Sequence, residues 1–492
     1  MGKNIGADIL KSSFGLLYTG AKYLVKGKVL SNKTGADFSS KSDYKHYLNS
    51  HNKGLLLNGG DLSLDEKMSF QNVAVIASIG AGKTSRYIIP NVLKLANTKS
   101  SIVVNDPKGE VFDETSAFMK SRGFKVIVID PENINRSSLF NPLLEAKNHI
   151  ELEQIAEILI KAGGSGKAND DFWQQGAMRF VSLFLKVLQN AGRFNPKYFT
   201  LHNLYYLFQN FGDDGTNLDK FMTKYCKNPN DPFDDGLWNE YKGLLTGNKE
   251  GVQSFVLNAI TSLKALSNQS IAKITSKSNI DLENLRGEKT IIYFITPAQH
   301  AEYYSFFTSL FFRSVFNSCM RKIPTKKDLP IYILYDEFGH STIPNFVSTA
   351  NTIRGYRVSL SVVLQSISQL NSRYGKDVAE SIKGGFNTYL AYSGSDPTTA
   401  EFFEKIIGRV RERQKDEVLD YKDQYREYNL INSAEIRMIA DDEVLIVSSN
   451  KQAIKLKTTP YFENWKLKRQ AQKGSINIKN DNKSITLKYV EL

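Results

Sequence analysis

Short apolar runs rich in β-branched residues alternate along the chain with segments of helical periodicity. Such runs are apolar on both faces, which is typical of parallel strands covered by helices on both sides. The predicted strands are Val73–Ala77, Ser101–Val104, Lys125–Ile129, Thr290–Ile295, Pro330–Tyr335, Val358–Leu364 and Glu443–Val447. Because helical patterns separate most of them, the sequence predicts an α/β fold with a mostly parallel sheet.

The alternation stops between about residues 145 and 285, where helical patterns follow one another without a strand pattern. These patterns cover Glu151–Lys161, Phe172–Gln189, Leu201–Phe211, Asp234–Leu245 and Gly251–Leu266. We therefore expect an α/β domain interrupted by an all-helical insertion. The expected parts are a basic segment (1–62), the α/β domain (63–144 and 286–470), the insertion (145–285) and a polar C-terminal tail or edge hairpin (471–492).

Composition limits the classes of protein that the chain can belong to. Of its 492 residues, 41% are hydrophobic and 23% are charged, values typical of globular proteins. The two cysteines, Cys226 and Cys319, have no second Cys or His at ligand spacing, and no two histidines pair at helical spacing. A disulfide scaffold and a structural zinc site are therefore excluded, and a reducing compartment is indicated.

Charge is unevenly distributed along this basic chain, whose formal net charge is +13. Residues 1–53 hold nine lysines and three aspartates, a local excess of +6. Apolar positions between Lys11 and Lys28 could form a helical stripe, either for a membrane surface or partner or for packing on the chain's own domain. A second basic cluster, Arg409–Arg413, is interpreted as a solvated helical face.

No uncharged run is long enough for a transmembrane helix. The longest, Tyr198–Gly212 and Val358–Ser372, are shorter than the roughly 18 residues required. The sequence is therefore interpreted as that of a soluble protein.

Residues 77–84 read ASIGAGKT and match the phosphate-binding pattern G-x-x-x-x-G-K-[ST], with Ala77 replacing the first glycine. Glycines allow backbone N–H groups to surround a phosphate at a helix N-terminus. Lys83 is expected to reach the β- and γ-phosphates, and the Thr84 hydroxyl to hold Mg²⁺. A strand pattern precedes the loop and a helical pattern follows it, with a kink expected at Pro90. The expected nucleotide-binding residues are Gly80, Ala81, Gly82, Lys83, Thr84 and Ser85.

The predicted strand at Pro330–Tyr335 ends in two adjacent acids, Asp336 and Glu337. An aspartate at the C-terminal end of such a strand suits a contact to hydrated Mg²⁺, and the glutamate could orient and deprotonate an attacking water. A phosphate-binding loop and an acidic pair in one α/β domain together predict a nucleoside triphosphatase.

Four motifs occur in a fixed order across residues 73–461: DPKGE (106–110), FNPL (140–143), DEFG (336–339) and LQS (364–366). With them the chain resembles the type IV secretion coupling proteins of the TraG/TraD type, which are RecA-like ATPases. The resemblance implies ATP and Mg²⁺ as cofactors and Gln365 as a sensor of the γ-phosphate. It also implies a trans-acting arginine finger at Arg354, for which Arg357 is a rival candidate.

The resemblance further implies a hexameric motor that delivers relaxase-bound single-stranded DNA to a type IV secretion channel, with double-stranded DNA as the alternative substrate. Relaxase and channel ATPases would be its partners, and the bacterial cytoplasm its location. Most family members begin with two transmembrane helices. None is expected here, so a separate anchor protein or the basic segment would hold the chain at the membrane. The alternatives are an FtsK-like double-stranded DNA translocase and a nucleotide-switched substrate receptor without pumping activity.

Overall fold

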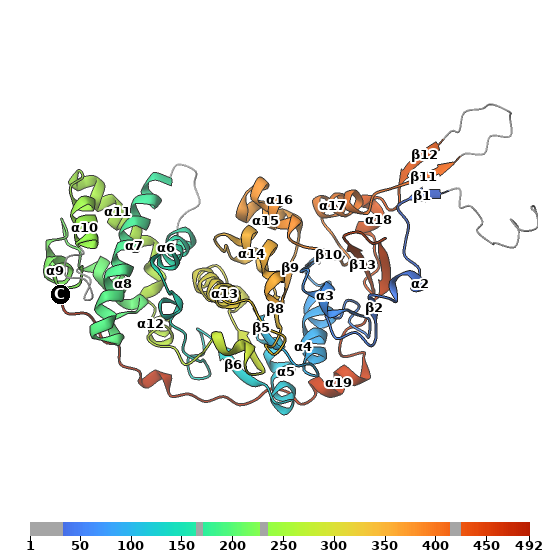
Figure 1. The fold of residues 1–492 in the computed structure, drawn as a ribbon, viewed down its shortest axis with the longest axis horizontal. Coiled ribbons are helices and arrows are strands. Elements are labelled where there is room, and N and C mark those ends of the chain that lie inside the picture. Colours follow the sequence, from blue (N-terminus) through green and yellow to red (C-terminus); the bar gives the residue numbers. More distant parts are fainter. Residues whose placement is uncertain (1–32, 164–170, 227–234, 414–424) are drawn as a thin grey trace, which may run out of the picture.

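The central sheet is mostly parallel, as the sequence predicts (Figure 1). The computed structural model describes residues 33–163, 171–226, 235–413 and 425–492, and within these ranges nine strands pair in the order β14-β13-β10-β4-β9-β8-β5-β7-β6. The strands from β10 to β6 are parallel, and β13 and β14 are antiparallel at one edge. Their bounds are β4 Val73–Ile76, β5 Ser101–Asn105, β6 Lys125–Ile129, β7 Thr290–Phe294, β8 Ile331–Tyr335, β9 Val358–Leu364, β10 Thr388–Ala391, β13 Glu443–Ser448 and β14 Ile454–Lys457.

Successive residues of the strands pack into two hydrophobic cores, one on each face of the sheet. Val73 and Val75 belong to one core, and Ala74 and Ile76 to the other, because neighbouring side chains on a strand point to opposite faces. The first core contains residues of α4 (Ile89–Leu95), α5 (Glu110–Ser121) and α19 (Trp465–Ala471), with the short elements α2 (Lys41–Tyr44), α3 (Glu66–Ser69), β2 (Leu48–Asn49) and β3 (Ser63–Leu64) beside them. The second contains residues of α13 (Ser305–Met320), α14 (Phe346–Thr352), α15 (Ile367–Tyr374), α16 (Lys376–Gly384), α17 (Pro397–Ile407) and α18 (Ser433–Arg437).

Between β6 and β7 the described chain is helical and contains no strand. The helices are α6 His149–Gly163, α7 Asp171–Phe194, α8 Leu201–Gln209, α9 Asp219–Tyr225, α10 Gly236–Leu245, α11 Lys249–Ser262 and α12 Gln269–Ile274. Their buried side chains, such as Leu152 and Phe180, belong to the same core as Ala74 and Ile292 of the sheet. Since the helices and the sheet share this core, the predicted division into domains stays a prediction.

The two connections between the sheet and the helical segment lie side by side. The Phe140 N–H donates to the Ile274 carbonyl at 2.9 Å, and the Asn279 N–H donates to the Leu139 carbonyl at 3.1 Å. The incoming and outgoing linkers are therefore joined to each other by backbone hydrogen bonds.

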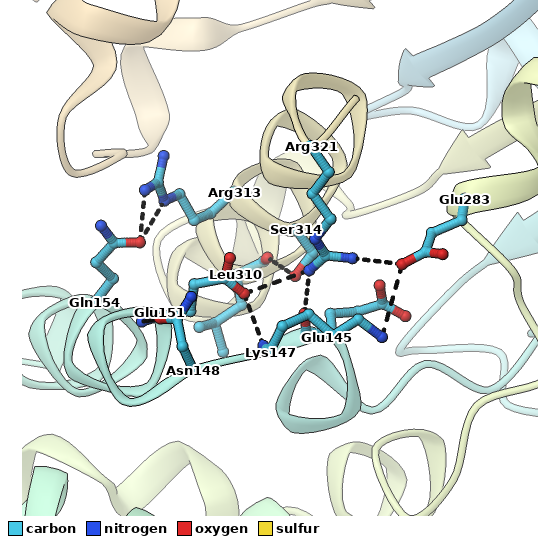
Figure 2. A network of polar contacts seen from close by, with 10 residues as sticks. All are labelled: Glu145, Lys147, Asn148, Glu151, Gln154, Glu283, Leu310, Arg313, Ser314 and Arg321. Atoms are coloured by element: carbon cyan, nitrogen blue, oxygen red, sulfur yellow. Dashed lines mark hydrogen bonds and ion pairs between the residues drawn. The ribbon is translucent and has the colours of Figure 1, made fainter. Parts of the chain in front are cut away.

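Polar contacts join α6 to the end of α13 near these linkers (Figure 2). The Arg321 guanidinium donates to Glu283 at 2.9 Å, forms an ion pair with Glu151 at 3.3 Å, and donates to the backbone carbonyl of Glu145. Figure 2 also shows the Arg313 guanidinium donating to the side-chain oxygen of Gln154, at 3.1 Å from Nε. These contacts fix α6 against α13.

The C-terminal segment, residues 472–492, crosses from α19 beneath the sheet to the helical segment (Figure 1). We call it the strap. Asn482 donates to the Ile134 carbonyl at 3.0 Å midway, and the Val490 N–H donates to Asn203 of α8 at 3.1 Å. The Tyr489 ring packs against Tyr206 of α8. The sequence allowed either a tail or an edge hairpin here. The hairpin alternative is wrong, because these residues contain no strand.

The basic cluster Arg409–Arg413 is strand β11, so the helical interpretation is wrong. It pairs with β1 (Lys33–Gly35) and β12 (Tyr425–Asn429) in a three-stranded arm that projects from the body (Figure 1). The stripe expected between Lys11 and Lys28 lies outside the described residues. No helix in the described ranges has the length and apolar character needed to cross a membrane.

Candidate active site

The phosphate-binding loop follows β4 and is shaped by two glycines. Gly80 and Gly82 have φ angles of 84° and 76°, in the left-handed region that favours glycine. Ala77, at the position of the first glycine, is fully buried. A small residue is therefore what this position requires, and alanine meets that requirement. Ser85 closes the next turn, with its hydroxyl donating to the Gly82 carbonyl at 3.2 Å. Of the six expected nucleotide-binding residues, Gly80 to Lys83 form the loop, and Thr84 and Ser85 begin the helix that follows it.

The helix after the loop begins with a wide turn. Residues Thr84–Ile88 are π-helical, and the α-helix α4 starts at Ile89, directly before Pro90. The sequence predicts a kink at Pro90, and the structure shows a change of helix type there. A π-helical turn next to a proline is consistent with the missing N–H of that residue.

Asp336 lies directly after β8 and faces the loop. It is 4% exposed, and the Thr84 hydroxyl donates to its Oδ2 at 3.4 Å. The Asn105 side chain donates to the Asp336 backbone carbonyl at 2.6 Å, which fixes the end of the strand. Burial, together with the charge of Glu337, raises the pKa of Asp336 to about 6.

Glu337 connects the loop, the acidic pair and the glutamine motif. Lys83 forms an ion pair with its Oε1 at 2.8 Å, and Gln365 donates to its Oε2 at 2.9 Å. His340 lies 3.5 Å from the same Oε2. Burial would raise the pKa of Glu337, but the hydrogen bonds from His340, Lys83 and Gln365 and the charge of Lys83 lower it to about 2.

The backbone of Glu337 is also unusual. Its φ of 52° lies in the left-handed region, where a non-glycine residue is strained. Such strain costs on the order of 1–3 kcal/mol and is often found at functional sites. The sequence predicts Glu337 as a site residue but gives no signal for this conformation or for the contact with His340.

A cavity of about 310 Å³ opens beside the loop. It is lined by Lys83, Thr84, Asp336, Glu337 and Gln365, together with the DPKGE segment, the end of β7 and the start of α13. The structure therefore brings together the predicted residues of the loop, the acidic pair and the glutamine motif. Among the DPKGE residues, Asp106 is 1% exposed, and burial together with the charge of Asp336 raises its pKa to about 7.

The two candidate finger arginines lie away from this cavity. They precede β9 at one end, whereas Gln365 follows β9 at the other, roughly 20 Å away at 3.3 Å per residue. Arg354 is exposed, and Arg357 donates to the carbonyls of Thr325 and Asp328 at 2.8 and 2.9 Å. Neither reaches the loop of its own chain, and a role in trans stays a prediction.

Comparison with known proteins decides the family. The family model for type IV secretory system conjugative DNA transfer matches residues 24–485. The chain belongs to this family. This conjugative DNA-transfer family is the one that the order of the four motifs indicates.

Individual relatives agree with this family assignment. Protein VirD4 of Rhizobium rhizogenes is 24% identical over 421 residues, which are 80% of this chain and 59% of VirD4. The chain thus spans about three fifths of the length of this relative. The unbound conjugative coupling protein TrwBdeltaN70 matches with a TM-score of 0.69 at 13% identity, over 87% of this chain and 92% of its own. A structure of TrwB in complex with ADP and Mg²⁺ matches with a TM-score of 0.67, also at 13% identity, over 87% of this chain and 94% of its own. The fold of this family member is therefore that of a RecA-like P-loop NTPase.

Proposed function

We propose that the chain is an ATP-driven coupling protein that delivers relaxase-bound single-stranded DNA to a type IV secretion channel. The observation that carries the proposal is the contact of Glu337 with both Lys83 and Gln365 in a member of the conjugative DNA-transfer family. A receptor that used nucleotide only as an assembly switch would not need a glutamate in this position. Hydrolysis is therefore part of the proposal.

The residues of the site fit a nucleotide with Mg²⁺. Gly80 has open space around the position of a Cβ, so that the loop backbone is accessible to a phosphate. The Thr84 hydroxyl and the Asp336 carboxylate offer oxygen ligands, which are the type of ligand that Mg²⁺ prefers. The structure of TrwB with ADP and Mg²⁺ supports the same pair of cofactors here. The metal, when bound with the nucleotide, would neutralise charge on the phosphates.

Lys83 and Glu337 neutralise each other in the structure, and this pairing suggests how binding prepares the site. A phosphate in the loop would attract the Lys83 ammonium away from Glu337 Oε1. That carboxylate oxygen could then accept a proton from an attacking water. Gln365 would keep its hydrogen bond to Glu337 Oε2 and hold the carboxylate in place. The position of the Gln365 side chain would therefore depend on the state of Glu337.

The assembly and partners belong to the same proposal. Arg354 would act on the nucleotide of a neighbouring subunit in a homo-hexamer, because it is exposed and remote from its own loop. The net charge of +13 suits a polyanionic substrate. Relaxase and the channel ATPases are proposed as partners from the family alone.

The test is steady-state ATP hydrolysis by the purified chain, alone and with single- or double-stranded DNA, over a range of protein concentrations. We expect turnover to rise with single-stranded DNA and with protein concentration, because a trans arginine makes hydrolysis depend on assembly. Lys83→Ala serves as the background control, since it removes the phosphate contact.

Each other result would change the proposal. Stimulation by double-stranded DNA alone would favour an FtsK-like translocase. Binding of ATP without turnover under any of these conditions would favour the receptor module. Absence of nucleotide binding would overturn the proposal.

A further inference from the structure

Two buried oxygen atoms beside the loop have no hydrogen-bond partner among the described residues: Asp106 Oδ1 and Asn105 Oδ1. The two residues are 1% and 3% exposed, and both line the cavity that Lys83 and Thr84 line. A buried acceptor without a donor costs about 1–3 kcal/mol. Two on adjacent residues at a cavity therefore call for a bound group with donors.

The local fold explains only one oxygen of Asp106. Its Oδ2 accepts a hydrogen bond from the Phe112 N–H at 2.9 Å, near the start of α5. The chain reaches this position through a left-handed turn at Gly109, with φ of 76°. A helix cap requires a single acceptor, which Ser or Asn also supplies. The second carboxylate oxygen thus has no role in the cap.

The sheet places these oxygens next to Asp336. Strands β5 and β8 are parallel neighbours, with Asn105 opposite Tyr335, so the residues that follow both strands meet at the same edge. The Asn105 amide donates to the Asp336 backbone carbonyl at 2.6 Å, which leaves its Oδ1 as the unpartnered atom.

The charges at this edge suit a hydrated divalent cation. Asp106, Asp336 and Glu110 line one cavity, and Asp336 is within reach of the Thr84 hydroxyl. The described residues contain no group of three or more His, Cys, Asp or Glu side chains that could hold a metal directly. Contacts through water suit this arrangement, because Mg²⁺ usually keeps several waters when it binds with phosphates.

We propose that Asp106 is a positioning residue for Mg²⁺: with Asn105, it accepts hydrogen bonds from waters bound to the metal that accompanies the nucleotide. This inference rests on the proposed nucleotide-binding function. It assigns to the DPKGE motif a role in metal affinity that is separate from the cap of α5. Outer contacts of this kind typically change metal affinity 10–100-fold.

The test is Asp106→Asn, which keeps an oxygen for the Phe112 N–H and replaces the other oxygen by a donor. Binding of a fluorescent, non-hydrolysable ATP analogue is measured while Mg²⁺ is titrated. We expect the variant to require about 10–100 times more Mg²⁺ for half-maximal binding. Its affinity for the analogue in EDTA should equal that of the wild type.

Asp130→Asn is the matched control. Asp130 is also 1% exposed and follows a parallel strand, β6. Both of its oxygens have partners: the Glu132 and Asn133 N–H groups for Oδ1, and Arg136 for Oδ2. It does not line the cavity, so its substitution should lower thermal stability without changing the Mg²⁺ midpoint.

The outcomes separate this inference from the function on which it rests. If the wild type binds no nucleotide, the proposed function fails. If the wild type binds with Mg²⁺ and Asp106→Asn has the same Mg²⁺ midpoint, the inference is overturned. If circular dichroism shows that Asp106→Asn does not fold, Asp106→Ser takes its place in the test, because serine keeps one oxygen that can cap α5. A crystal structure of the wild type with the analogue and Mg²⁺ gives the second measurement: a metal-bound water within about 3.2 Å of Oδ1 supports the inference, and its absence overturns it.

Discussion

At the scale of single residues, Glu337 combines a strained backbone with three polar neighbours. A carboxylate with a pKa of about 2 is fully ionised at neutral pH. While Lys83 is bonded to it, such a group is a weak proton acceptor. Loss of this contact on nucleotide binding would increase its basicity, so the site would become reactive only when a phosphate occupies the loop.

Substitution of this residue gives a direct prediction. Glu337→Gln keeps the size of the side chain and removes the proton acceptor, so nucleotide affinity should change little while turnover falls at least about 100-fold. The measurement is analogue binding beside steady-state hydrolysis. Glu157→Gln is the matched control, because Glu157 also forms an ion pair with a lysine, Lys161 at 2.7 Å, but does not line the cavity. Residual hydrolysis within about tenfold of the wild type would remove Glu337 from the role of base.

The sequence identifies site residues whose chemistry follows from spacing. Lys83 and Thr84 occupy fixed positions in a loop pattern, and Asp336 ends a strand that is apolar on both faces. Asp106 could not be assigned a role in this way, because its neighbours are set by strand order. The contact of His340 with Glu337, three residues earlier, depends instead on the left-handed backbone at Glu337. Strands β5 and β8 are separated by more than 200 residues, and only their pairing brings Asp106 near Asp336.

At the scale of elements, the junction between α6 and α13 depends on Arg321. We expect Arg321→Met to lower the free energy of unfolding by about 1–3 kcal/mol, because it removes hydrogen bonds from a charged, mostly buried donor. The urea midpoint is the measurement. Lys147→Met is the control, since Lys147 is half exposed and pairs with Glu283 at 3.7 Å, and its effect should stay below about 1 kcal/mol. Equal shifts for both variants would show that the junction does not depend on Arg321.

The elements predicted from the sequence are those with long apolar or periodic patterns. All seven predicted strands are present, within one residue at each end. Strand β10 escapes prediction because its four residues, Thr388–Ala391, include a single β-branched side chain, whereas β4, of equal length, has three. Strand β11 is wrongly predicted as helical because four of its five side chains are charged. A single apolar residue, Val410, gives only a weak signal of the apolar–polar alternation that is typical of a strand. The pairing of β11 with β12, which follows shortly after it, and with β1, which lies far earlier in the chain, supplies the stability that local propensity does not.

At the scale of the whole molecule, the strap is held on the helical segment by a buried histidine. His202 Nε2 lies 3.2 Å from the Lys488 carbonyl, and its ring packs against Tyr489. Burial lowers the pKa of His202 below its ordinary value of 6.5, although the bond to Lys488 opposes this shift. The folded state therefore favours the neutral ring.

This shift predicts a pH-dependent attachment of the strap. A detached histidine takes up a proton first, so the stabilisation is present above about pH 6.5 and is lost as the pH falls toward the lowered pKa. Hydrogen exchange of residues 485–492 should therefore show less protection at pH 5.5 than at pH 7.5, after correction for intrinsic rates. His202→Asn should lose this difference, whereas His300→Asn, an exposed control, should keep it. The same pH dependence in His202→Asn would contradict the prediction.

The strap also limits how the molecule can move. The two linkers between sheet and helices lie side by side, and a shared core together with the contacts of Arg321 holds the helices against the sheet. The strap adds a further tie, because it donates hydrogen bonds to the Ser137 carbonyl of the incoming linker and then ends on α8 (Figure 1). Its other end continues into α19, which packs in the same core as α4, the helix that follows the phosphate-binding loop. Any swing of the helical segment would therefore place the strap under tension and transmit that force to the nucleotide site.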